Sequence, residues 1–128
     1  MTIETKAHRI LVVEDEALIA MQLEDFLTAL GHSVEAIATR MDRAVLLATD
    51  IDIDIDFAIL DVNVAGTQSF PVADILRHRG ISFMFATGYG TAGLVAGYRD
   101  EVTLRKPYGP QELELAMARA FRAPLLAA

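Results

Sequence analysis

The stretch Phe57-Ala-Ile-Leu-Asp-Val-Asn-Val-Ala-Gly66 carries the pattern that decides the fold. Four apolar residues, Phe57 to Leu60, run without a polar interruption and end at one carboxylate, Asp61. A short apolar run of this kind is typical of a strand covered on both faces, as in a parallel sheet between helices. The acidic residue at its end predicts a site at the carboxyl edge of that sheet.

The segments on either side alternate between strand-like and helical patterns. We predict strands over residues 8–13, 32–37, 57–60, 81–86 and 102–105. We predict helices over residues 16–30, 39–49, 69–79, 91–98 and 111–122. Gly31 suits the position after the first helix, and Thr39 is the expected N-cap of the second. The fourth helix is the weakest because Gly93 and Gly97 lower its helix propensity.

This alternation predicts an α/β fold, a doubly wound five-stranded parallel sheet with helices on both faces. For a chain of 128 residues, the flavodoxin-like strand order 2-1-3-4-5 is expected. We expect residues 1–7 to form a flexible N-terminal segment, residues 8–123 a single domain, and residues 124–128 a short tail with no further domain.

Composition and charge exclude several classes of function. The formal net charge is -7 and the 11 basic residues are scattered, so contact with nucleic acid is not expected. The chain has no cysteine, which excludes disulfides, zinc–thiolate sites and thiol catalysis. No signal peptide or membrane span is visible, so a cytoplasmic protein is expected. His8, His32 and His78 lack metal-ligand spacing and are interpreted as surface or strand-edge residues.

The segment Asp50-Ile-Asp-Ile-Asp-Ile-Asp56 alternates acidic and apolar residues. A calcium loop of the EF-hand type needs Gly at its sixth position and Glu at its twelfth, where this segment places Ile55 and Asp61. We therefore interpret it as a solvated connector whose isoleucines pack under the sheet.

Acidic residues also follow the first predicted strand, as Glu14-Asp15. Clustered carboxylates repel one another unless a cation neutralises them. Carboxylate and carbonyl oxygens are ligands that suit Mg²⁺. We predict a Mg²⁺ site with Asp15 and Asp61 as direct ligands. Glu14 would act directly or through water, and the backbone carbonyl of Asn63 would complete the set.

Two more polar residues end the fourth and fifth predicted strands, Thr87 and Lys106. Phosphoryl transfer requires an in-line nucleophile and compensation of spreading negative charge. Asp61 can act as the nucleophile and form an aspartyl phosphate. The Lys106 ammonium and the Thr87 hydroxyl can then contact the phosphoryl oxygens.

The run Gly88-Tyr-Gly-Thr-Ala-Gly93 matches the dinucleotide-binding pattern G-x-G-x-x-G. Its context is wrong, because it follows the fourth strand and no acid lies about twenty residues further on at a strand end. We therefore expect no organic cofactor. The glycines are better explained as making the fourth helix and its entry loop easy to rearrange.

Together these motifs resemble the receiver domains of two-component response regulators, from His8 to Phe121. The resemblance rests on residues 10–16, 57–66, 85–88 and 104–108. It implies a CheY-like fold, a cis Lys106–Pro107 peptide, and phosphoryl transfer from a sensor histidine kinase or phosphotransfer protein to Asp61. It also implies a monomer or weak dimer that acts through a downstream protein or as a phosphate sink. Such a domain is no enzyme beyond its own phosphotransfer and slow dephosphorylation.

The sequence departs from the common receiver pattern in several places. Thr103 stands where many receivers carry a switching Phe or Tyr, and Tyr89 or Tyr108 could supply a substitute ring or simply pack. The Phe85-Ala-Thr-Gly88 run resembles a mainly alphaproteobacterial subgroup that lacks this aromatic and often consists of a single domain. Ala65 stands where Pro is common, and we expect this change to have little effect.

The sequence leaves one alternative function open, a pseudo-receiver that binds partners without phosphorylation. Thr103 favours it slightly. The complete set of Asp15, Asp61, Thr87 and Lys106 argues against it more strongly, because an inactive site has no need for a costly cluster of carboxylates.

Overall fold

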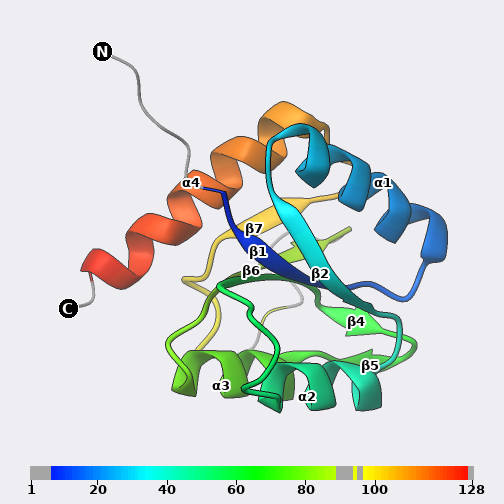
Figure 1. Ribbon diagram of the computed structural model, residues 1–128, viewed down its shortest axis with the longest axis vertical. Coiled ribbons are helices and arrows are strands. Elements are labelled where there is room, and N and C mark those ends of the chain that lie inside the picture. The colour runs from blue at the N-terminus through cyan, green and yellow to red at the C-terminus, as the bar shows by residue number, and fades with distance from the viewer. Residues whose placement is uncertain (1–6, 89–93, 95–96, 127–128) are drawn as a thin grey trace.

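The computed structural model describes residues 7–88, 94 and 97–126, and the side chains within these ranges up to residue 121 (Figure 1). The strands are β1 (Arg9–Val13), β2 (Ser33–Ala38), β3 (Phe57–Asp61), β4 (Asn63–Val64), β5 (Thr67–Gln68), β6 (Ser82–Thr87) and β7 (Thr103–Arg105). The helices are α1 (Ala17–Ala29), α2 (Met41–Thr49), α3 (Phe70–His78) and α4 (Pro110–Leu126). None of these helices is long and apolar enough to cross a membrane.

Five strands form one parallel sheet in the order β2-β1-β3-β6-β7. This is the predicted order 2-1-3-4-5 once the small hairpin β4–β5 is set aside. That hairpin is antiparallel and was not predicted. The register pairs Val13 with Leu60, Asp61 with Ala86 and Thr87 with Arg105. The carboxyl ends of β1, β3, β6 and β7 are therefore level with one another.

Helices cover both faces of the sheet, as predicted for a doubly wound fold. In Figure 1, α1 and α4 lie on one side and α2 and α3 on the other. Alternate residues of a strand point to opposite faces. Leu11 and Val13 accordingly join the core beneath α2 and α3, while Ile10 and Val12 join the core beneath α1 and α4. The apolar run of a single strand thus contributes to two separate cores.

Several local predictions need correction. The helix after β2 begins at Met41 with Arg40 as its N-cap residue and no side-chain cap, so the predicted Thr39 cap is wrong. Gly31 does follow α1 with a φ of 94°, a conformation that favours glycine. The predicted helix over residues 91–98 lies largely outside the described residues, as do most of the N-terminal segment and the end of the tail.

The predicted packing of isoleucines in the acidic connector before β3 is confirmed in part. Ile55 is buried and Ile53 packs against the core beneath α2 and α3, whereas Ile51 is 80% exposed. The interpretation of His32 as a surface or strand-edge residue also needs correction. His32 immediately precedes the edge strand β2, but its side chain is buried. The burial of His32 depends on a residue that is distant in sequence, His8, whose ring stacks on it.

Candidate functional site

The polar ends of the parallel strands meet around one cavity of about 450 Å³. Its lining includes Asp15, Asp61, Asn63, Thr87 and Lys106 from the predicted site. The predicted residues come together because parallel strands of matched register end at the same edge of the sheet. Glu14 lies directly beside them, in contact with Lys106.

Lys106 is the charged centre of the site. Its Nζ donates hydrogen bonds to Glu14 Oε1 at 2.6 Å and to Asp61 Oδ2 at 3.1 Å. Its backbone N–H donates to the carbonyl of Thr87 at 2.9 Å, and the Lys106–Pro107 peptide is cis as expected. Burial would lower the pKa of Lys106, but its hydrogen bonds to the two carboxylates outweigh burial and raise that pKa. The ammonium is therefore charged and held between two carboxylates.

Glu14 is almost completely buried, with 3% of its surface exposed. Burial raises the pKa of Glu14 from 4.5 to about 7, and the nearby charge of Asp61 adds to this rise. The hydrogen bonds from Lys106 and from the Glu16 N–H, the latter 3.1 Å long, act in the opposite direction. Both oxygens of Glu14 are thus engaged by groups of the protein.

The other two carboxylates are held by the hairpin β4–β5. Asp15 Oδ2 accepts a hydrogen bond from the Ala65 N–H at 3.0 Å, and Asp61 Oδ1 accepts a longer one from the Asn63 N–H at 3.4 Å. Proline has no backbone N–H, so this first bond requires a residue other than proline at position 65.

Three carboxylate oxygens, one each from Glu14, Asp15 and Asp61, lie within 4.8 Å of one another. This spacing brings three acidic groups close enough to share one cation, and a cavity with room for water adjoins them. Mg²⁺ prefers oxygen ligands and usually keeps several waters. The described residues therefore fit the predicted metal.

The aromatic candidates of the sequence have different surroundings. Tyr108 packs against the core beneath α1 and α4, and burial raises its pKa to about 12. Thr103 contributes no ring, and its hydroxyl donates to the carbonyl of Glu101 at 3.3 Å. Tyr89 and the rest of the glycine-rich run, up to Gly93, lie outside the described residues.

Sequence reasoning missed the packing of Tyr98, which is buried in the core beneath α2 and α3. Its ring stacks on Phe70, the first residue of α3, with centroids 5.0 Å apart, and contacts Phe85 of β6 edge-on. The Arg77 guanidinium lies 4.4 Å from the centroid of the Tyr98 ring. Tyr98 stands at the end of a weak helical pattern, which gave no signal of these contacts because the partners lie on two other elements, α3 and β6.

Comparison with known proteins agrees with this geometry, although no family model matches the chain. SdrG from Sphingomonas melonis Fr1 is 39% identical with a TM-score of 0.78, and the match covers 90% of this chain and 97% of SdrG. The receiver domain of the PhyR response regulator from Erythrobacter litoralis is 26% identical with a TM-score of 0.77, and the match covers 91% of this chain and 92% of that domain.

Curated relatives point the same way. The phyllosphere-induced regulator PhyR of Methylorubrum extorquens is 31% identical over 119 residues, which are 90% of this chain and 44% of PhyR. The two-component response regulator PhoP of Pseudomonas aeruginosa is 32% identical over 121 residues, 89% of this chain and 52% of PhoP. The chain thus spans about half the length of the curated relatives it matches.

A five-stranded doubly wound sheet with acidic, hydroxyl and lysine side chains at one edge, together with these relatives, defines the class: a signalling domain of the response-regulator type. The chain belongs to the receiver domains of two-component response regulators. The family resemblance and the CheY-like fold predicted from the sequence are both confirmed.

Proposed function

We propose that this chain accepts a phosphoryl group on Asp61 and acts as a switch in a two-component phosphorelay. The observation that carries the proposal is the position of the Lys106 ammonium, which bridges Asp61 and the buried Glu14 at the edge of an open cavity. A carboxylate paired with a fixed cation beside solvent-filled space can react with a phosphodonor and keep its product neutralised.

In the proposed reaction, a carboxylate oxygen of Asp61 attacks the phosphorus of a phosphohistidine. A new P–O bond forms as the P–N bond breaks, and the departing imidazole nitrogen keeps the electron pair and takes a proton from solvent. Lys106 exchanges its contact with Asp61 for one with a phosphoryl oxygen. The Thr87 hydroxyl, which lines the same cavity, donates to another of these oxygens.

Mg²⁺ held by Asp15, Asp61 and the Asn63 carbonyl would supply positive charge to the phosphoryl oxygens. The placement of Asn63 supports its inclusion. In the hairpin, Val64 and Thr67 flank the turn, and Asn63 and Gln68 form the next pair. Antiparallel pairs alternate between hydrogen-bonded and non-hydrogen-bonded, so the N–H and C=O of Asn63 both point away from β5. We assign Glu14 a contact through water, because its oxygens already accept hydrogen bonds from Lys106 and Glu16.

The phosphodonor in this proposal is a sensor histidine kinase or a histidine phosphotransfer protein. Such kinases draw phosphate from ATP, so we assign the exchange to the cytoplasm. The output is a change in protein–protein contacts by a monomer or weak dimer, or the removal of phosphate from a shared pathway. This output fits the family, whose members bias a pre-existing equilibrium between conformations.

The test is intact mass after incubation with acetyl phosphate and Mg²⁺. The wild-type chain should gain one phosphoryl group, and Asp61→Asn should gain none. Asp56→Asn is a matched control, because Asp56 precedes the same strand at the opposite edge of the sheet, and it should react like the wild type. Without Mg²⁺ the gain should be lost. Absence of any gain, with acetyl phosphate and with candidate kinases, would favour the pseudo-receiver instead.

A further inference from the structure

The turn of the hairpin β4–β5 has an unusual residue at its first position. Ala65 has a φ of 51° and Gly66 a φ of 85°. Two consecutive residues of positive φ are what a tight two-residue hairpin turn requires, and glycine or asparagine usually fills them. Among the described residues, Ala65 is the only non-glycine residue with a positive φ. The chain therefore accepts a strained backbone at this point.

The hairpin is fixed at its base. Val64 is completely buried in the core beneath α2 and α3. The Ser69 N–H donates to the carbonyl of Val62 at 2.9 Å, which closes the loop between β3 and α3. The turn is thus held in a set position relative to Asp61, rather than moving as a free loop tip.

The strained turn aims one backbone amide at the site. The Ala65 N–H donates to Asp15 Oδ2 at 3.0 Å, across 50 positions of the sequence. A hydrogen bond to one oxygen restricts the rotation of a carboxylate group. The other oxygen then points in a fixed direction, away from the donor. Such supporting hydrogen bonds fix the orientation of metal ligands, and their loss typically weakens metal binding about 10–100-fold.

We infer that the Ala65 amide is a positioning group for the metal site, which orients the Asp15 carboxylate so that its free oxygen can bind Mg²⁺ together with Asp61. The inference rests on the proposed function, since it assumes that Asp15 is a metal ligand. It adds a backbone donor from the hairpin to that site and gives a reason for the strained turn. The Ala65 side chain is exposed, so the backbone carries the role.

The decisive variant replaces only the Val64–Ala65 amide by an ester, through incorporation of the α-hydroxy analogue of alanine at position 65. The ester keeps the side chain and the shape of the backbone but removes the N–H. Ala65→Gly is the matched control, because glycine keeps the N–H and accepts the positive φ without strain. Mg²⁺ affinity is measured by NMR titration of backbone amides in the full chain, with the fold of each variant checked by circular dichroism.

We expect the ester variant to bind Mg²⁺ about 10-fold more weakly than the wild type, and Ala65→Gly to bind it within about 2-fold. An ester variant that is folded and binds Mg²⁺ as tightly as the wild type would overturn the inference while leaving the metal site intact. A wild-type chain that binds no Mg²⁺ at all would instead overturn the metal site on which the inference rests. The two failures are therefore distinguishable.

Discussion

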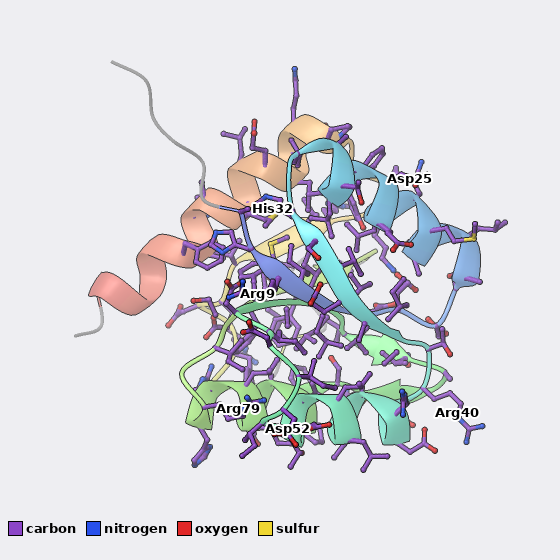
Figure 2. All side chains as sticks on the ribbon, viewed as in Figure 1. Arg9, Asp25, His32, Arg40, Asp52 and Arg79 are labelled. Carbon is purple, nitrogen blue, oxygen red and sulfur yellow. The ribbon has the colours of Figure 1, made fainter. Side chains whose placement is uncertain are left out.

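Both edges of the parallel sheet carry titratable groups, but their surroundings are very different. At the carboxyl edge, Glu14, Asp61 and Lys106 form a hydrogen-bonded set beside an open cavity. At the amino edge, His8 and His32 stack on each other, 5.4 Å apart between ring centroids. Figure 2 shows His32 beside the start of β1, near α4.

Aromatic packing closes the amino edge. The His8 ring stacks on Phe121 of α4 at 3.8 Å, and Phe121 lies 4.5 Å from the ring of Phe57. His8 also pairs with Asp56, with Nδ1 and Oδ1 3.3 Å apart. These groups face rings and strands, whereas the groups at the other edge face space that a ligand can enter. A cluster of titratable residues can therefore be structural or functional. The surroundings of the side chains, packed rings or an open cavity, distinguish the two cases.

Phe57→Ala gives the largest expected effect and tests whether the amino edge is structural. Phe57 is fully buried, and truncation of such a ring costs about 3–5 kcal/mol in the free energy of unfolding. Urea denaturation measures this loss. The folded fraction should still accept a phosphoryl group on Asp61 at the wild-type rate, measured by intact mass without denaturant. A folded Phe57→Ala chain that has lost phosphoryl acceptance would contradict the separation of the two edges.

Lys106→Met is the corresponding change at the carboxyl edge. Removal of a preorganised charge at a reacting centre slows the chemistry about 10²–10³-fold. We expect the rate of phosphorylation to fall by this factor. The free energy of unfolding should change far less, because the unpaired Glu14, whose pKa is already about 7, can take up a proton.

Arg9→Met is the matched control for Lys106→Met. The Arg9 Nε pairs with Asp54 at 2.9 Å, but both side chains are at least half exposed, and exposed pairs of this kind contribute little. Neither the phosphorylation rate nor the stability should change measurably. If the two variants behaved alike in the phosphorylation assay, Lys106 would have no special part in the reaction.

The contrast between the edges also shows what the sequence could predict. Apolar runs that end in polar residues are a local signal, and parallel strand order brings their ends together. The convergence of these residues at one edge could therefore be predicted without coordinates. The hairpin β4–β5 could not, because two-residue strands have no periodicity and its turn uses Ala65 rather than the usual glycine or asparagine. The burial of His32 depends on residues far away in the chain, which no local pattern reports.

Glu14→Gln should change how stability depends on pH. Since burial raises the pKa of Glu14 from 4.5 to about 7, the folded chain binds this proton more tightly than the unfolded chain. The contribution of Glu14 to the free energy of unfolding therefore falls as pH rises from about 4.5 to about 7, by about 1–3 kcal/mol. Urea denaturation of the wild type and of Glu14→Gln between pH 4.5 and 8 measures the free energy of unfolding of each. The difference between the two free energies should change with pH. A constant difference across this range would show that Glu14 is not a perturbed acid.

His32→Gln should give the smallest effect, with the opposite sign. Burial lowers the pKa of His32 and the neighbouring His8 lowers it further, while Asp56 and Glu114 act to raise it. The folded chain therefore prefers the neutral ring, whose Nδ1 accepts the His8 backbone N–H at 3.0 Å. A protonated Nδ1 could not accept this bond.

The stability that His32 contributes is thus complete above its unfolded pKa of about 6.5 and is lost as pH falls through its lower pKa in the folded chain. We expect this loss of stability at low pH to be absent in His32→Gln and retained in His78→Gln, whose histidine is exposed. NMR titration of the His32 ring measures the direction of its pKa shift independently of stability. As pH rises, Glu14 contributes less to the free energy of unfolding and His32 contributes more. In the wild type the two contributions should therefore partly cancel at pH values below about 6.5. This cancellation should disappear in either single variant. If neither substitution changed how the free energy of unfolding depends on pH, the assignment of opposite signs to the two edges would be wrong.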